Sequence, residues 1–303
     1  MKKKSGFEKF YSGEKKGAAK KEQFRQDKRK WKKELTAKAE ERRQKAASEA
    51  HGIAPKIVRE KVPEQMPLNK YISHSGVCSR RDAVDVIKSG KVKVKGEVIT
   101  EPGHKVSQND SVTLAGKKIH PAKNLINILL NKPKDYITTT DDPQQRKTVL
   151  DLIGDATKER IYPVGRLDRN TSGVLLLTND GDLSQKLTHP SNEIKKVYAV
   201  TLNKPLDKKD FDAILKGVPL EDGMANIDVL AFTDATDKTQ VGVELHSGRN
   251  RIVRRIFEHF GYDVRALDRV MFAGLTKKNV NRGKWRFLTE KEVRDLKYFK
   301  KGK

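Results

Sequence analysis

The hydrophobic pattern of residues 65–120 changes from a helical period to a strand period. Apolar positions in "LNKYISHSG" and "RRDAVDVIKSG" fit two helices, each of which ends at a glycine. Ser79 and Asp82 match a capping box at the start of the second helix, with Asp in place of Glu. The next stretch, "KVKVKGEVIT", alternates with period two and predicts a strand that turns at Gly96 into a hairpin.

The pattern from residue 121 to residue 296 predicts more strands than helices. The apolar runs "INILL" and "GVLLL" fit buried strands, and the "NDG" that follows the second run is typical of a hairpin turn. "ANIDVLAFTD" and "TQVGVELHSG" fit an antiparallel pair, whereas "RNRIVRRIFEHFG" has the apolar spacing of a helix. We therefore expect an α+β protein whose larger domain has a mixed, mostly antiparallel sheet with flanking helices.

The overall charge favours a nucleic-acid partner. The chain has 303 residues and a formal net charge of +25, and neutralising phosphates supplies affinity without base recognition. An anionic membrane surface is the alternative, but no apolar run approaches the ~20 residues of a spanning helix. The single cysteine, Cys78, argues against disulfides and a Cys-rich metal site, and no apolar segment typical of a secretory signal follows the basic N-terminus. We expect a cytoplasmic protein without metal or small-molecule cofactor.

The two ends of the chain differ from the rest in composition. The first 60 residues hold 20 lysines and arginines against 9 acidic residues, a net charge of +11. Such a block is typical of a disordered tail that contacts RNA non-specifically. We therefore predict a basic tail (1–64), a small RNA-binding domain (65–120), a larger domain (121–296) and a basic C-terminal tail (297–303).

The segment "GRLDRNTSGVLLLTNDG" places one carboxylate, Asp168, between Arg166 and Arg169 just ahead of a buried strand. A neighbouring guanidinium would keep Asp168 ionised and oriented, and a positioned carboxylate suits nucleophilic attack or general base catalysis. The alternative is that Asp168 caps a turn and that the arginines are surface charges.

Two other side chains bear on this choice. Tyr198, in "KKVYAV", shares a strand face with Val200 and Leu202, where a core aromatic is the simpler interpretation. Arg254 lies at the border of the apolar stripe of the helix predicted in "SGRNRIVRRIFEHFG". From such a border an arginine can reach a carboxylate in a bidentate pair, although most border arginines are solvated.

The helix–helix–hairpin segment resembles the small RNA-binding domain named after a small-subunit ribosomal protein. The resemblance covers about residues 66–118 and depends on "SRRDA" and "SGKVKVKG". Lys95 departs from it, because we expect Asn in a "VNG" turn. A generic basic α+β module with a solvated lysine face is the alternative. In this domain we expect RNA contacts from Lys70, Ser79, Arg80, Arg81, Lys91, Lys93 and Lys95.

Four ordered motifs resemble the ribosomal-RNA pseudouridine synthases of the RsuA type. They are "NKPKDYITTTDDPQQRKTVLDLI", "GRLDRNTSGVLLLTNDGD", "KKVYAV" and "GRNRIVRRIFEHFGYDV". With the preceding domain, the resemblance covers about residues 66–295, and "KTVLDLI" and "GKWRFLTEKEV" are most similar to the large-subunit branch. The resemblance implies a monomer that isomerises one uridine of ribosomal RNA, free or in a pre-ribosomal particle, to pseudouridine.

The resemblance also implies roles for individual residues. Asp168 matches the essential aspartate, and Tyr198 matches the tyrosine that stacks on the target uracil and is proposed to assist proton removal at C5. Arg254 matches the basic residue that pairs with the aspartate, and Arg166 matches an arginine that fills the gap left by the flipped base. Ile252 stands where the family more often has Gln or Glu. In this domain we expect further RNA contacts from Lys196, Arg249 and Arg251.

The chemistry of isomerisation agrees with the residues present. The reaction breaks the N1–C1′ bond, turns the free uracil and rejoins it through C5, with no redox change or phosphate transfer. The base must leave its helix, which requires a stacking partner and a placeholder. Whether Asp168 bonds C1′, bonds C6 or removes a ribose proton stays open. The alternative function is a non-catalytic RNA-binding ribosome-assembly factor on the same scaffold.

Overall fold

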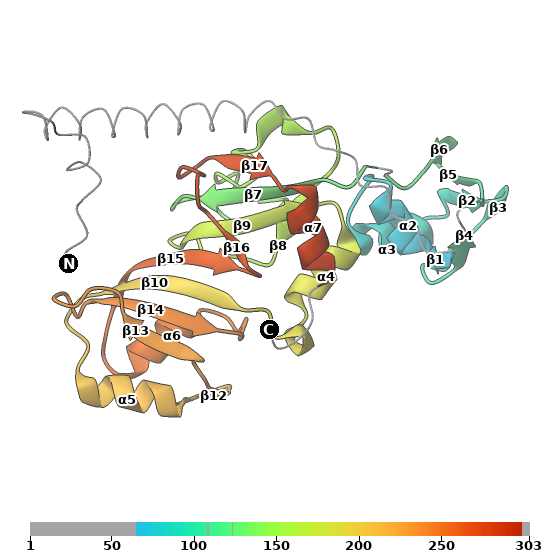
Figure 1. Cartoon of the computed structure of the whole chain (residues 1–303). Helices are drawn as coiled ribbons and strands as arrows, with labels where there is room; N and C mark the ends of the chain where they lie inside the picture. The colour runs from blue at the N-terminus through green and yellow to red at the C-terminus, as the bar shows by residue number, and fades with distance from the viewer. Residues whose placement is uncertain (1–64, 108, 123, 299–303) are drawn as a thin grey trace, which may run out of the picture. The chain divides into compact units, whose positions relative to one another are not determined.

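The computed structural model describes residues 65–107, 109–122 and 124–298 (Figure 1). The predicted N-terminal tail (1–64) lies outside these residues, as does most of the predicted C-terminal tail (297–303). None of the helices in the described ranges has the length and apolar content that a membrane span requires.

The first part of the described chain has the predicted helix–helix–hairpin order and its own hydrophobic core. Its helices are α2 (Leu68–His74) and α3 (Arg80–Lys88). Its strands are β1 (Gln65–Pro67), β2 (Val92–Val94), β3 (Glu97–Val98), β4 (Lys105–Ser107), β5 (Val112–Leu114) and β6 (Lys117–Ile119). Strand β1 pairs with β4, and the other four form a sheet in the order β3-β2-β5-β6. The capping box is present, because Ser79 Oγ accepts from Asp82 N and Asp82 accepts from Ser79 N.

The geometry of the β2–β3 turn shows why asparagine, not lysine, is the residue expected at position 95. Lys95 and Gly96 both have positive φ, 52° and 94°, as a two-residue hairpin turn requires. Asn or Gly adopts this conformation at lower cost than lysine. The Lys95 side chain pairs with Asp110 across the turn at 3.1 Å.

The larger domain is built on a nine-stranded sheet whose main path is β13-β14-β10-β15-β9-β7-β17. Its strands are β7 (Asn127–Lys132), β8 (Tyr162–Val164), β9 (Ser172–Thr178), β10 (Lys196–Leu202), β13 (Val229–Phe232), β14 (Gln240–Leu245), β15 (Val264–Phe272), β16 (Leu275–Thr276) and β17 (Trp285–Phe287). One pair in this sheet, β15 with β9, is parallel. A separate hairpin joins β11 (Val218–Leu220) to β12 (Gly223–Ala225). The prediction of a mixed, mostly antiparallel sheet is confirmed.

Four α-helices accompany this sheet (Figure 1). They are α4 (Gly181–Thr188), α5 (Lys208–Lys216), α6 (Ile252–His259) and α7 (Glu290–Lys297), and two short 3₁₀ turns are η1 (Gly154–Ala156) and η2 (Pro190–Asn192). The hairpin predicted at "NDG" is wrong. Asp180 instead caps α4 by accepting hydrogen bonds from the backbone amides of Asp182 and Leu183. Because of this cap, a helix begins where the sequence motif predicted a turn.

Strand β9 is buried on both faces, which fixes the position of the loop before it. Val174 and Leu176 pack in a core cluster that also contains α4 and α7 side chains, whereas Leu175 and Leu177 pack with Val149 and its neighbours. Successive side chains of a strand point to opposite faces, so a continuous apolar run is required here. The "GVLLL" run is therefore the central strand that the sequence predicts.

Candidate active site

A cavity of about 620 Å³ lies beside the loop that precedes β9. Its wall includes seven residues that the sequence singles out: Arg166 and Asp168 from the loop, Lys196 and Tyr198 from β10, and Arg249, Arg251 and Ile252 from the segment that begins α6. Apolar side chains complete the wall, among them Leu167, Val253, Leu267 and Phe272. A pocket of this size, lined by both apolar and charged side chains, is typical of a small-molecule or nucleotide site.

A buried lysine holds the backbone on which Asp168 is carried. Lys132, at the end of β7, is 0% exposed. Its Nζ donates to the carbonyl oxygens of Asp168, Arg169 and Thr171 at 3.1, 3.2 and 2.8 Å, and to that of Pro133 at 3.1 Å. Burial lowers the pKa of Lys132 to about 8, and the Asp168 carboxylate opposes this shift. One ammonium group therefore organises the whole turn.

The same loop is fixed from a second side by Thr138. Its hydroxyl donates to the carbonyl of Leu167 at 2.8 Å and accepts from the Leu167 amide at 3.3 Å. Arg169, which follows Asp168 in the chain, faces Asp135 at 3.5 Å and forms no ion pair with Asp168. Arg166 is exposed and lines the cavity, and no described residue forms an ion pair with it.

Arg254 reaches the Asp168 loop from behind the cavity. It is 9% exposed, and its Nη1 donates to Val264 O at 2.8 Å, while Nη2 donates to Asn170 O at 3.5 Å. Burial lowers the pKa of Arg254, and the charge of Asp168 opposes that shift. Among the described residues the two side chains do not form the bidentate pair that the sequence suggested. The interaction between Asp168 and Arg254 is electrostatic and takes place without a direct hydrogen bond.

The Tyr198 side chain lies between two hydrophobic clusters of the larger domain. It is half-buried and packs against two hydrophobic clusters, one on each side of it. Its strand β10 pairs with β15, where Tyr198 lies opposite Arg269, next to a β-bulge between Val197 and Tyr198. The core interpretation and the catalytic interpretation are therefore compatible, because the ring is packed and also lines the cavity.

Two cations expected to bind RNA are engaged by backbone carbonyl groups. Lys196 Nζ donates to Ile194 O and His246 O, both at 2.7 Å, and burial followed by the charge of Arg269 lowers the pKa of Lys196 to about 8. Arg249 Nη1 donates to three successive carbonyls of the β11–β12 turn, at 3.1 to 3.2 Å. Both line the cavity. The ammonium group of Lys196 and the Nη1 of Arg249 are engaged within the protein, whereas Nε and Nη2 of Arg249 have no hydrogen-bond partner among the described residues.

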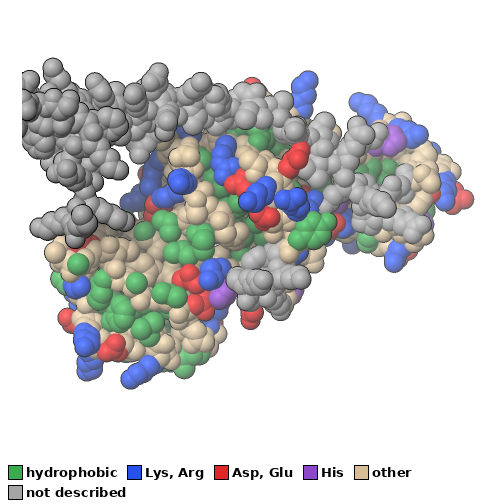
Figure 2. All heavy atoms as spheres, in the orientation of Figure 1, with side chains coloured by type: hydrophobic (Ala, Val, Ile, Leu, Met, Phe, Trp, Pro, Cys, Tyr) green, Lys and Arg blue, Asp and Glu red, His purple; other side chains and the backbone are tan. Residues whose placement is uncertain are grey.

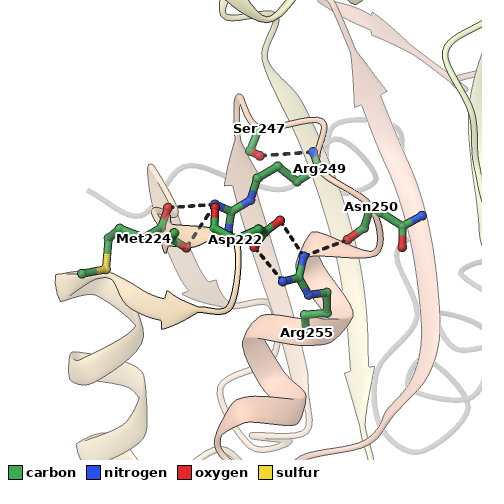
Figure 3. Close-up of polar contacts among 7 residues, drawn as sticks. Asp222, Met224, Ser247, Arg249, Asn250 and Arg255 are labelled. Atoms are coloured by element: carbon green, nitrogen blue, oxygen red, sulfur yellow. Dashed lines mark hydrogen bonds and ion pairs between the residues drawn. The ribbon is translucent and has the colours of Figure 1, made fainter.

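Figure 3 shows how the turn that ends in α6 is tied to the β11–β12 hairpin. Asp222 accepts from Arg255 at 2.6 and 3.0 Å and pairs with Arg249 at 3.4 Å, so two arginines hold one carboxylate (Figure 3). Arg251, at the start of α6, has a positive φ of 46° and pairs with Glu258 at 3.2 Å. The clamp fixes the loop that supplies one wall of the cavity.

The predicted RNA-binding residues of the first domain fall into two groups. Lys70 pairs with Asp182 at 2.6 Å, and Ser79 caps α3. The others are exposed: Arg80, Arg81, Lys91, Lys93 and Lys95. Lysine and arginine side chains are spread over the face seen in Figure 2, with acidic side chains among them. Exposure alone therefore does not mark a binding surface.

Sequence reasoning missed two buried cations, Lys132 and Arg269. Each interrupts an apolar strand: "NILLNK" ends in Lys132 and "VRALDRVMF" contains Arg269. A charged residue on the buried face of a strand is costly unless it is paired, and this was the available signal. Most of the groups that they contact lie far away in the chain, so the pattern does not identify these contact partners.

Family models and curated relatives match the chain over most of its described length. A model for RNA pseudouridylate synthase matches residues 126–259, and one for the S4 domain matches residues 66–112. A ribosomal large subunit pseudouridine synthase B of Bacillus subtilis is 40% identical over 233 residues, 76% of this chain and 95% of that protein. The dual-specificity RNA pseudouridine synthase RluF of Escherichia coli is 36% identical, over 76% of this chain and 77% of that protein. A crystal structure titled as a pseudouridylate synthase superimposes with a TM-score of 0.55 at 26% identity, covering 76% of this chain and 99% of that one.

Proposed function

We propose that this chain, which belongs to the RNA pseudouridylate synthase family and is a pseudouridine synthase, acts on one uridine of large-subunit ribosomal RNA. The names of two relatives, a ribosomal large subunit synthase and a dual-specificity RNA synthase, support the substrate class. The S4-type domain and the charge of +25 support binding to a structured RNA. With this substrate, the chain takes part in ribosome biogenesis in the cytoplasm. We propose that it acts as a monomer.

The observation that carries the proposal is the cavity that contains both Asp168 and Tyr198. Asp168 is presented on a loop whose backbone is fixed by Lys132 and Thr138, and it is influenced by the buried charge of Arg254. A preorganised carboxylate needs little rearrangement when it attacks or deprotonates the substrate.

The cavity walls fit a flipped uridine. The Tyr198 ring can stack on the uracil, and the apolar side chains of Leu267, Val253 and Phe272 line the same space. We assign the gap that the base leaves in the RNA helix to Arg166, and the exposure of this side chain in the cavity wall supports the assignment. Binding energy along the RNA then offsets the cost of extruding the base.

The domain division supports the same function. We assign residues 65–120 to RNA binding and residues 121–296 to catalysis, with basic tails at 1–64 and 297–303. The matched S4 and synthase segments fall within these two domains. Sequence-independent contacts position the RNA, and the cavity selects the uridine.

The proposal is tested by tritium release from C5 of uridine in unmodified large-subunit ribosomal RNA. Asp168→Asn removes the charge and keeps the shape, so we expect product formation to be abolished while RNA affinity changes by less than about threefold. Asp135→Asn is the matched control, because Asp135 is an exposed aspartate that faces Arg169. It should release tritium at the wild-type rate.

The outcomes separate catalysis from binding. Release by wild type and by the Asp135 variant alone supports the proposal. Absence of release by the wild type from large-subunit RNA, from small-subunit RNA and from pre-ribosomal particles would overturn it in favour of an assembly factor. Equal losses of binding and turnover in a folded Asp168→Asn variant would contradict the catalytic role of that carboxylate.

A further inference from the structure

Arg269 is a buried cation with no carboxylate partner in the described part of the chain. The side chain is 3% exposed. Its Nε donates to Val174 O at 2.8 Å, and its guanidinium carbon lies 4.6 Å from the centroid of the Phe272 ring. Its Nη2 has no hydrogen-bond partner among the described residues. Burying an unpaired charge is expensive, so a charge kept at this position calls for a partner that acts during the reaction.

The closest carboxylate in sequence is engaged elsewhere. Asp268 accepts from Ser172 Oγ at 3.0 Å and pairs with Lys277 and with Arg282. Neighbouring residues of a strand point to opposite faces, so Asp268 serves the other face of β15. Arg269 is left facing the cavity, in whose wall it lies with Tyr198 and Asp168.

Arg269 shares its part of the cavity wall with Tyr198. The two residues lie opposite one another in the β10–β15 pairing. Burial lowers the pKa of Arg269, and the Tyr198 side chain is what opposes that shift, by charge and by hydrogen bonding. Lys196, two residues before Tyr198, adds a second cation to the same region.

The backbone is shaped to bring Arg269 to this place. Gly173 lies opposite Arg269 in the parallel β9–β15 pair and has a φ of 114°. A Cβ atom at Gly173 would lie 2.1 Å from the carbonyl oxygen of Arg269. Only glycine therefore permits this approach of the two strands, and the approach puts Val174 O within reach of the guanidinium.

We propose that Arg269 is a positioning residue that acts through Tyr198, by holding its hydroxyl and stabilising negative charge on its oxygen. The inference rests on the proposed function. When C5 has bonded to C1′, the C5–H bond must break, its electron pair returns to the ring, and the proton passes to a base. A neutral phenol is a poor acceptor, whereas a phenolate oxygen accepts the proton and becomes the hydroxyl. A cation fixed beside the oxygen favours that charged form.

A double-mutant cycle tests the inference. Arg269→Gln should lower single-turnover tritium release on the order of 100-fold, with RNA affinity and KM changed by less than about threefold. In the Tyr198→Phe background, which lacks the hydroxyl, the same substitution should cost no more than about threefold. If the fold-loss of rate in the double variant equals the product of the losses in the two single variants, the two residues act independently and the inference is overturned. Arg265→Gln is the matched control, since Arg265 is an exposed arginine of the same strand, and it should keep the wild-type rate.

Two further readouts separate this role from a general loss of structure. Arg269→Lys keeps the charge and should recover at least about tenfold of the lost rate. The ratio of the Arg269→Gln rate to the wild-type rate should increase with pH, because alkaline conditions favour the charged form of a phenol that has lost its neighbouring cation. An unchanged pH profile would contradict the assignment. Tritium release by the wild type is required throughout, and its absence would overturn the proposed function and the inference together.

Discussion

The cations around the cavity and the cations of the small N-terminal domain are placed in opposite ways. Lys132, Lys196 and Arg249 direct their donors to backbone carbonyl groups, whereas Lys91 and Lys93 are exposed on or beside β2. A buried cation gains most from a fixed set of acceptors, and an exposed one gains most from mobile phosphates. The difference teaches that some basic residues of this chain hold loops in place, whereas the exposed ones are those that we propose to contact RNA.

The largest effect is expected from Lys132→Met, which tests the first of these jobs. Four carbonyl oxygens would lose their shared donor, so we expect the free energy of unfolding to decrease by about 3 kcal/mol. Displacement of the Asp168 loop should also lower turnover on the order of 100-fold. Urea unfolding and tritium release measure the two. Lys134→Met, at an exposed lysine two residues away, is the control, and equal effects at both positions would remove the distinction.

The second prediction concerns the basic residues 1–60. Deleting them removes a net charge of +11, so affinity for RNA should fall by about tenfold at low salt and depend less steeply on salt concentration. Turnover at saturating RNA and the identity of the modified uridine should not change. Filter binding across a salt series and mapping of the product provide the test. A truncated enzyme that modified a different uridine would show that the tail takes part in recognition.

The third prediction uses the pKa of Lys132, which burial lowers to about 8. Below that pH the ammonium group is protonated and supplies its donors to the loop; as the pH rises through about 8 the charge is lost. Turnover should therefore fall several-fold between about pH 7 and about pH 9.5. Lys132→Met should flatten this decline, whereas Lys196→Met, at the other lysine with a pKa near 8, reports the separate contribution of that group. If turnover of Lys132→Met declines with pH as much as that of wild type, the decline is caused by a group other than Lys132.

The smallest effect is expected from Lys91→Gln combined with Lys93→Gln. Both side chains are exposed and lie outside the cavity, so the double variant should bind RNA about threefold less tightly, and the salt slope should fall by about 1 to 2. The turnover of bound RNA should equal that of wild type. Isothermal binding and single-turnover rates separate the two. A loss of turnover without a loss of affinity would place these lysines in catalysis instead.

The sequence predicted most of the secondary-structure elements and the proposed catalytic aspartate, but it did not predict which side chains contact one another. Capping by Ser79, the α6 helix and the antiparallel β13–β14 pair depend on neighbours within a few residues, and each was predicted. The "NDG" turn was wrong because Asp180 can cap a helix as well as start a turn. The expected pair between Arg254 and Asp168 was not found, because the Arg254 guanidinium donates to the carbonyl oxygens of Val264 and Asn170.

The sequence by itself determined that Asp168 precedes a buried strand and that Tyr198 lies on a neighbouring one, because hydrophobic period and turn residues encode elements locally. Only the tertiary structure decided which cations surround them. Lys132 comes from a strand 36 residues earlier than Asp168, and Arg269 comes from one paired with β10 at a bulge. The order and register in which strands pair are set by the packing of the whole sheet, and no local pattern contains them.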